Sequence, residues 1–277
     1  MSEKGRQYHI GLSAGEVSPY VLLPGDPARV PMIAKLWDKR EHVVTNREYC
    51  TWRGTVGGMP ITCTSTGIGG PSAAIAIEEL VKIGCHTFIR VGTCGSLQTF
   101  VNVGDLVIST ATVREDGTSV QYVPLSYPAV ANLDVTLALR DAAARCGLRA
   151  HTGIGQTKDA FYTEGAEDLP MAEAQKERWA CWKRANVLST SMEAAALFVI
   201  GSIRRVRVGE VLAVIGLTYR DEPITKKVGV EAAARCGIEA MKTLYENDRQ
   251  AVERRAATRR RGALRGRGGR AAKSRRR

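Results

Sequence analysis

Short apolar segments that end at glycine or proline alternate along the chain with longer stretches of helical periodicity. The segment 20–23 ends at a PGDP turn, 59–65 ends at GIGGP, and 86–91 ends at GTCG. Residues 72–83, 131–146 and 228–245 carry apolar side chains at helical spacing, and 105–111 and 209–217 are further apolar runs. Strands separated by helices predict one α/β domain with a largely central sheet, spanning residues 8–245.

The positive charge of the chain lies almost entirely in its tail. The protein has 277 residues, with 40 Lys and Arg against 28 Asp and Glu, a net charge of +12. Residues 249–277 hold 13 of these bases and one acid, so the rest of the chain holds 27 of each. The tail has almost no large apolar side chain, which predicts disorder. A nucleic-acid partner is therefore expected only through the tail, and a merely solubilising role is an equal alternative.

Composition excludes several classes of protein. With 44% hydrophobic and 25% charged residues, the chain is typical of a soluble globular protein. Its seven cysteines lie at least nine residues apart, so they form no CxxC or zinc motif and are expected to be small buried residues in a reducing cytosol. Residues 1–12 are too polar for a signal peptide, and no apolar run approaches 18 residues. We therefore expect a cytoplasmic protein with no membrane partner.

Three glycine-containing turns, 25–29, 65–72 and 90–95, each follow a predicted strand and contain a cation or a hydroxyl. Turns beyond the carboxyl ends of strands line the ligand crevice of an open α/β sheet, where backbone amides and arginines bind anions. The chain has neither a Walker lysine nor GxGxxG. These turns therefore favour inorganic phosphate over a nucleotide polyphosphate.

Five motifs occur in a characteristic order: PGDPxR at 24–29, STGIGGPS at 65–72, RVGTxG at 90–95, NVGD at 102–105 and SME at 191–193. In order and spacing they resemble those of the nucleoside phosphorylases of the phosphorylase-I superfamily, the uridine phosphorylases most closely. The resemblance covers about residues 8–245. It implies a nucleoside phosphorylase-like fold with a central mixed sheet flanked by helices. It also implies that a pyrimidine nucleoside, uridine in the first place, is cleaved with phosphate to the free base and ribose 1-phosphate.

The resemblance implies a phosphate site that two subunits share. Its phosphate-binding residues in this sequence are Gly25, Arg29, Arg90 and Thr93, with Arg47 donated by the neighbouring subunit. His9 matches a histidine that crosses the same interface to the ribose 5′-hydroxyl. A dimer therefore completes the active site, and the dimers are expected to assemble into a hexamer.

The resemblance also implies residues for the sugar, the base and a cation. Met192 and Glu193 match the pair beside the ribose, Phe161 matches an aromatic near sugar and base, and Arg220 lies near an arginine that neutralises the leaving base. A monovalent cation, potassium, is implied between subunits at Glu48, Ile68 and Ser72. No cofactor is implied, and phosphate is the co-substrate.

These residue types suit phosphorolysis. A phosphate oxygen attacks C1′ through a transition state with oxocarbenium character, so arginines that position the anion and a carboxylate that fixes the ribose lower the barrier. The expected catalytic residues are Arg90, Arg220 and Glu193. Neither a protein nucleophile nor a metal is needed, in agreement with the lack of HExxH and GxSxG motifs.

The base loop departs from the uridine phosphorylase pattern. Family members read uracil with a glutamine and, two residues later, an arginine, and neither follows Phe161 at the expected place. Glu164 stands in this loop, and its carboxylate can only accept hydrogen bonds. Ser191 likewise replaces a family glutamate. Either another donor reads uracil, or the enzyme is a purine or broad-specificity phosphorylase, although residues 217–222 lack the Ser-Asp pair of the purine enzymes.

Overall fold

The computed structural model describes residues 5–165, 167–218 and 228–274, with side chains described as far as Ala256. Its strands are β1 (Tyr20–Leu23), β2 (Lys39–Asn46), β3 (Tyr49–Val56), β4 (Met59–Thr64), β5 (Thr87–Ser96), β6 (Leu106–Glu115), β7 (Ala129–Val130), β8 (Ala150–Lys158), β9 (Ser189–Ser191) and β10 (Arg207–Leu217). Its helices are α1 (Arg29–Ala34), α2 (Gly70–Lys82), α3 (Ser119–Tyr122), α4 (Leu133–Arg145), the 3₁₀ turn η1 (Phe161–Thr163), α5 (Ala172–Arg184), α6 (Ala194–Arg204) and α7 (Val230–Ser274). The five strands and three helices expected from periodicity are present, whereas the β2–β3 hairpin, β8 and α5 were not expected.

The described strands form one mixed sheet, part of which closes on itself. The strand order is β10-β6-β8-β9-β5-β1-β4-β3-β2, with β7 beside β6. Strand β10 also pairs in parallel with β5, from Arg207 opposite Thr87 to Leu217 opposite Ser96. Strands β5, β9, β8, β6 and β10 therefore form a closed ring, and the other strands extend from β5 as an open sheet. The predicted α/β fold with a central mixed sheet is confirmed.

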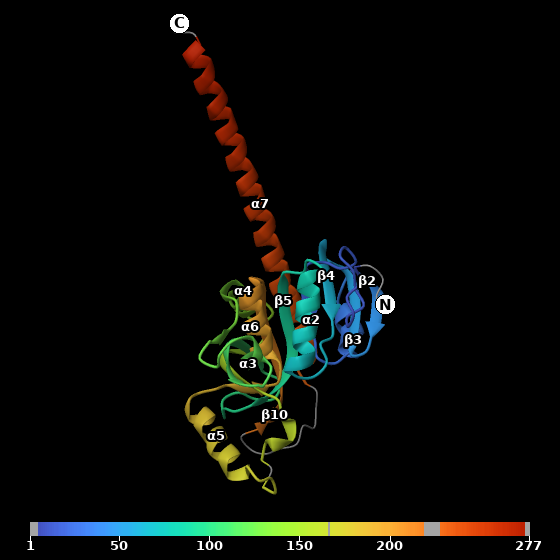
Figure 1. Ribbon diagram of the computed structural model, residues 1–277, viewed down its shortest axis with the longest axis vertical. Helices are drawn as coiled ribbons and strands as arrows, with labels where there is room; N and C mark the ends of the chain where they lie inside the picture. Colours follow the sequence, from blue (N-terminus) through green and yellow to red (C-terminus); the bar gives the residue numbers. More distant parts are fainter. Residues whose placement is uncertain (1–4, 166, 219–227, 275–277) are drawn as a thin grey trace.

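Alternate side chains of the central strands point into two separate cores. Leu22 and Ile89 pack with α4 and α7, whereas Val21, Leu23 and Phe88 pack with α2 and α6. This alternation is the period-2 geometry of strands that are covered on both faces. The helices therefore flank the sheet on its two sides, and α7 rises well beyond the rest of the molecule (Figure 1).

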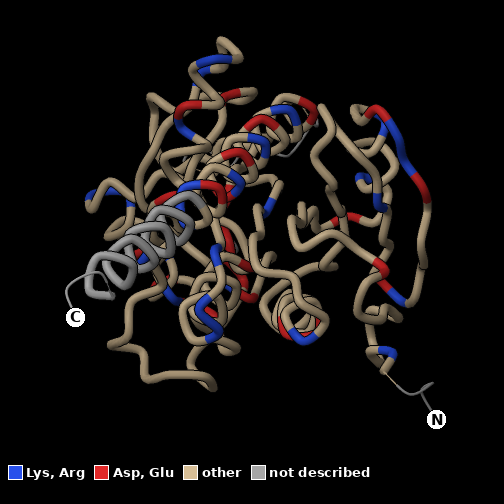
Figure 2. Tube along the Cα trace, turned by 90° about the horizontal axis from the view of Figure 1, so that it is seen from above, with Lys and Arg blue, Asp and Glu red and all other residues tan. Residues whose placement is uncertain are grey.

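Helix α7 continues through the segment for which composition predicts disorder. Its backbone is helical to Ser274, and every described side chain from residue 249 to 256 is exposed. Alanine and arginine both have high helix propensity, which accounts for helix in a segment whose described side chains are all exposed. The helix is fastened to the sheet just before this point, where Asp248 accepts hydrogen bonds from Tyr20 Oη at 2.7 Å and Arg207 Nη1 at 2.9 Å. In the body, by contrast, acidic and basic segments intermingle (Figure 2).

All seven cysteines are free, but they are not all buried. Cys146 and Cys181 are exposed, which corrects the expectation of burial, because Cys146 caps the C-terminus of α4 and α5 has no buried residue. The other five lie in the interior, where burial raises the pKa of Cys85 to about 12. Among the described residues, no helix has the length and apolar character needed to cross a membrane.

Candidate active site

The first two predicted turns lie against each other at one edge of the sheet. Strands β1 and β4 pair in parallel, so the turn after Leu23 and the loop after Thr64 leave the sheet together. Gly67 N–H donates to the carbonyl oxygen of Gly25 at 2.9 Å. Gly67 has φ +70°, and a Cβ there would lie 2.7 Å from Ser72 Oγ, so both backbone and space require glycine.

The third predicted turn is not a turn. Residues 92–95 continue β5 as strand, because β10 pairs with them up to Ser96. The glycines serve close packing instead. A Cβ on Gly92 would lie 2.5 Å from Leu212 Cδ2, and one on Gly95 would lie 2.1 Å from Thr218 Oγ1.

Arg90 on β5 is buried between two carboxylates. Its Nε donates to Glu210 Oε2 at 3.0 Å, and its Nη2 is paired with Glu193. Glu210, on β10, also accepts from Ser109 Oγ at 2.7 Å. The remaining nitrogen, Nη1, is buried and has no hydrogen-bond partner within the described part of the chain. One face of the guanidinium is thus fixed, and one donor is left for a ligand.

Arg29 and Gly25 lie beside that donor. A Cβ on Gly25 would stand 3.8 Å from Arg90 Nη1, so the absence of a side chain keeps this space open. Arg29 Nη2 lies 3.5 Å from Thr93 Oγ1. Burial, and to a smaller extent the neighbouring Arg90 cation, lowers the pKa of Arg29. Two partly desolvated cations and a hydroxyl close together are suited to bind a small anion.

The carboxyl of Glu193 ties this cluster to the loop at residues 65–72. Glu193 precedes α6, and its Oε1 accepts from Gly69 N–H at 3.0 Å while Oε2 accepts from Met192 N–H at 3.1 Å. An ionised carboxyl has about four lone-pair sites, and Gly69 N–H, Met192 N–H and Arg90 Nη2 use about three of them, so one remains on Oε1 for a hydroxyl donor. The structure therefore brings Gly25, Arg29, Arg90, Thr93, Met192 and Glu193 into one site.

Burial of charge in this cluster is uneven. Glu210 is 1% exposed, and burial raises its pKa although the Arg90 cation and the Ser109 hydroxyl oppose the shift. The carboxylates of Glu193 and Glu210 share the single guanidinium of Arg90. When both carboxyls are ionised, these three groups together carry one excess negative charge. Sequence reasoning missed Glu210, whose only signal is a lone acid within the apolar run of β10.

His9 and Arg47 lie apart from this cluster within the chain. His9 Nδ1 is 2.7 Å from Glu79 Oε1, and Glu79 Oε2 also accepts from the backbone N–H groups of His9 and Ile10. Glu79, on α2, was not predicted. Arg47 is exposed at the β2–β3 turn, 5.8 Å from the centre of the Tyr8 ring.

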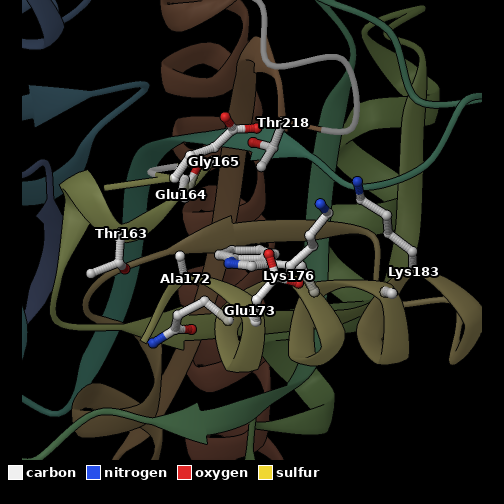
Figure 3. A pocket seen from close by; sticks show the side chains of 12 residues that line it. Thr163, Glu164, Gly165, Ala172, Glu173, Lys176, Lys183 and Thr218 are labelled. Carbon is white, nitrogen blue, oxygen red and sulfur yellow. The ribbon is translucent and has the colours of Figure 1, made fainter. Parts of the chain in front are cut away.

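One of the two expected base-binding residues, Glu164, lines a pocket of about 280 Å³. Figure 3 shows Glu164 and Gly165 facing Thr218 at one end of it, with Glu173, Lys176 and Lys183 of α5 along its side. Phe161 is 47% exposed in η1. Both Phe161 and Glu164 contact the ammonium group of Lys158, a residue that sequence reasoning did not single out.

The expected cation ligands are only partly brought together. Ser72 Oγ lies 2.7 Å from Glu48 Oε1, and a backbone hydrogen bond, aided by this hydroxyl, lowers the pKa of Glu48. Ile68 is 76% exposed on the loop between them. Arg220 lies outside the described residues.

Comparison with known proteins assigns the chain to a family. A model of the phosphorylase superfamily matches residues 19–259. The chain is 45% identical over 246 residues to a uridine phosphorylase of Treponema pallidum, covering 87% of this chain and 95% of the relative. It is 46% identical over 252 residues to a uridine phosphorylase of Thermococcus kodakarensis, covering 90% of each chain. A guanosine phosphorylase of Halorubrum lacusprofundi is 40% identical over 211 residues, 76% of this chain and 83% of the relative. The motifs, the fold and these similarities together make this chain a member of the phosphorylase superfamily.

Proposed function

We propose that this protein is a pentosyltransferase that cleaves uridine with inorganic phosphate into uracil and ribose 1-phosphate. The observation that carries the proposal is the unpaired, buried Nη1 of Arg90 beside Arg29, in a chain that is 45% and 46% identical to two uridine phosphorylases. An arginine donor held in this way is suited to an anion that must be oriented as well as bound.

In the proposed reaction, Arg29, Arg90, Thr93 and the backbone at Gly25 hold the phosphate. One of its oxygens forms a bond to C1′ while the bond from C1′ to the base nitrogen breaks, and the electron pair leaves with the base. The proton of hydrogen phosphate ends on the base, so the products are neutral uracil and ribose 1-phosphate. The sugar passes through an oxocarbenium-like state, in which positioning of the anion supplies much of the rate.

Glu193 and Met192 are proposed to hold the ribose. Because Glu193 is fixed by Arg90 and by Gly69 N–H, the remaining lone pair of its carboxyl is a preorganised acceptor, which the 2′- and 3′-hydroxyls are proposed to share. Phe161 is proposed to stack near sugar and base, and Arg220 to stabilise charge on the leaving base.

Assembly is part of the proposal. Arg47 is exposed at the β2–β3 turn beside Tyr8, which suits an arginine that serves a neighbouring subunit. His9, held by Glu79, is proposed to reach the partner's ribose 5′-hydroxyl from a dimer that assembles further into a hexamer. Oxygen donors at Glu48 and Ser72 fit a monovalent cation such as potassium, with Ile68 on the loop between them.

Three further assignments belong to the proposal. Seven free cysteines suit a reducing compartment, and we place the reaction in the cytoplasm. The guanosine phosphorylase among the relatives favours a purine or broad-specificity enzyme as the second candidate function. Binding of nucleic acid is proposed only for the basic tail, where it would weaken steeply with salt.

The proposal is tested by offering uridine, thymidine, deoxyuridine, inosine and adenosine, each with and without phosphate. Uridine should be consumed only when phosphate is present, with ribose 1-phosphate as product. Cleavage that does not depend on phosphate would overturn the phosphorylase assignment, and turnover of inosine without uridine would move it to purines. Deletion after Asp248 should leave the turnover intact, because described side chains from residue 249 onward are exposed.

A further inference from the structure

Lys158 is a buried lysine beside the expected base-binding loop. Its side chain is only 8% exposed, and the ammonium group forms an ion pair with Glu164. The same group lies 5.0 Å from the centre of the Trp179 ring and 5.5 Å from that of Phe161. Glu164 and Trp179 both line the 280 Å³ pocket, so Lys158 contacts two residues of its wall.

The position of Lys158 along β8 brings it next to the proposed sugar site. Strand β8 is parallel to β9, with Thr157 opposite Ser191. Thr157 Oγ1 accepts from Ala195 N–H at 3.1 Å, which fixes the end of β8 against the first turn of α6. Lys158 follows Thr157 directly, and Met192 and Glu193 follow Ser191. The pocket at Lys158 therefore adjoins the ribose end of the site, where the base of a bound nucleoside must lie.

The hydrogen-bonding capacity of Lys158 is not used up by the protein. An ammonium group has three donors, and apart from its ion pair with Glu164, Lys158 Nζ is buried without a hydrogen-bond partner in the described ranges of the chain. The two aromatic rings offer only cation–π contact. Burial lowers the pKa of Lys158 to about 7, a shift that the nearby Glu115 carboxylate partly opposes. Burying an ammonium group whose donors are not all used is unfavourable. A buried lysine is therefore understandable here if a bound ligand supplies a further acceptor.

We propose that Lys158 and Glu164 together read the edge of the base, with Glu164 accepting from the ring N–H and Lys158 donating to the adjacent carbonyl oxygen. This inference rests on the proposed function and supplies the donor that the loop after Phe161 lacks. Lys158 is then a base-recognition residue, and its charge faces the carbonyl on which negative charge grows as the base leaves.

The pair defines a substrate class rather than one base. Uracil, thymine and the 6-oxopurines all present a ring N–H beside a carbonyl, which matches one acceptor and one donor. Cytosine and adenine present a ring nitrogen acceptor beside an amino group, so both contacts would fail. The carboxylate would face a lone pair and the ammonium would face an N–H donor, a mismatch that excludes such bases strongly. Uridine, thymidine and inosine are thus compatible with the pair, and cytidine and adenosine are not.

The test compares Lys158→Met and Glu164→Gln with wild type and with Lys82→Met, which removes an exposed lysine in the last turn of α2. Lys158→Met should lower kcat/KM for uridine about 10- to 100-fold, the loss expected for a charged hydrogen-bond donor. The KM for phosphate and the melting temperature should stay at wild-type values, because Met fills the buried space without a charge. Glu164→Gln should retain most of the uridine activity, because an amide oxygen also accepts from N–H, whereas Glu164→Leu should lose it. Lys82→Met should behave as wild type.

The outcomes separate this inference from the proposed function. If the wild-type protein does not cleave uridine with phosphate, the proposed function fails. If it does, and Lys158→Met stays within roughly threefold of wild type in kcat/KM, the base-reading pair is overturned. A loss in Lys158→Met that comes with a raised phosphate KM and a lowered melting temperature also overturns it, since that pattern marks a structural lysine. Should this variant not fold, Lys158→Gln is measured in its place against the same criteria.

Discussion

Replacing Arg90 by methionine should remove both the structural and the ligand-binding contacts of this residue. The guanidinium is buried, holds Glu193 and Glu210 through Nη2 and Nε, and leaves only Nη1 for phosphate. Arg90→Met keeps an apolar stem of similar length but leaves two buried carboxyls, 5% and 1% exposed, without their cation. The variant should therefore lose phosphate-dependent turnover and stability together.

The size of the stability loss follows from that burial. Removing one partner of a buried ion pair costs about 3–5 kcal/mol. At about 2–4 °C per kcal/mol for a domain of this size, the melting temperature should fall by roughly 6–20 °C.

Without Arg90 the pKa of Glu210 rises further above its ordinary value. A group with a raised pKa contributes stability that is present below its unfolded pKa and is lost as pH rises through the folded pKa. The deficit of Arg90→Met should thus be larger at pH 8 than at pH 5.

A second substitution distinguishes the two roles. Glu210→Gln mimics the neutral form that burial already favours, so alone it should lower stability by no more than about 1 kcal/mol. Combined with Arg90→Met it removes the excess buried charge, and it should restore at least about 1 kcal/mol of the loss, a coupling measurable in a double-mutant cycle. Turnover should stay absent in the double variant, because the Nη1 donor is not restored.

The measurements are thermal unfolding at one protein concentration and initial rates against phosphate for the wild type, both single variants and the double variant. Additive losses of stability would refute the view that the two carboxyls depend on one arginine. Phosphate-dependent turnover in Arg90→Met within roughly tenfold of wild type would refute the location of the anion site.

Two further substitutions test contacts that the sequence did not reveal. Glu79→Ala should raise the KM for uridine but leave that for 5′-deoxyuridine unchanged, because the Glu79 carboxyl holds His9, which we propose contacts the 5′-hydroxyl; equal changes for both nucleosides would contradict this role. Asp248→Asn should lower stability at pH 7 by about 1 kcal/mol or less, since the carboxyl is 35% exposed and screened by solvent. Burial would raise the pKa of Asp248, but hydrogen bonds from Arg207 and Tyr20 outweigh it and lower the pKa. This stability is present above the unfolded pKa and is lost as pH falls through the folded one, so unfolding curves of variant and wild type should converge in acid.

Elements with strong local signals could be predicted from the sequence. The apolar run at β1 and the alanine-rich α4 were predicted because periodicity and punctuation agree there. The glycines at 92 and 95 led to the wrong prediction of a turn, because glycine occurs both in turns and where neighbouring side chains pack closely against the backbone. Only the pairing of β5 with β10 distinguishes the two, and that pairing joins residues more than a hundred positions apart.

The unpredicted site residues have a common physical reason. Glu79, Lys158 and Glu210 are ionisable residues within segments that otherwise read as ordinary helix or strand. Their importance comes from burial next to a partner that is distant in sequence, such as Arg90 for Glu210, and no local pattern records that. Family motifs identify residues that touch ligands in many members, so they too pass over residues that position those contacts or that replace them in this chain.

Net charge misleads about the anion site for a related reason. The excess of 12 positive charges lies after residue 248, whereas the arginine with the open donor, Arg90, is accompanied by two carboxylates, so that even with Arg29 its cluster has no surplus of positive charge. Its affinity for phosphate must therefore come from the direction of one buried N–H donor and from the nearby Arg29, rather than from a surplus of charge. Such a site favours a ligand that can accept directed hydrogen bonds over any anion that merely carries charge. Chloride, which is spherical, should compete with phosphate poorly, whereas arsenate, which shares its tetrahedral oxygens, should replace it.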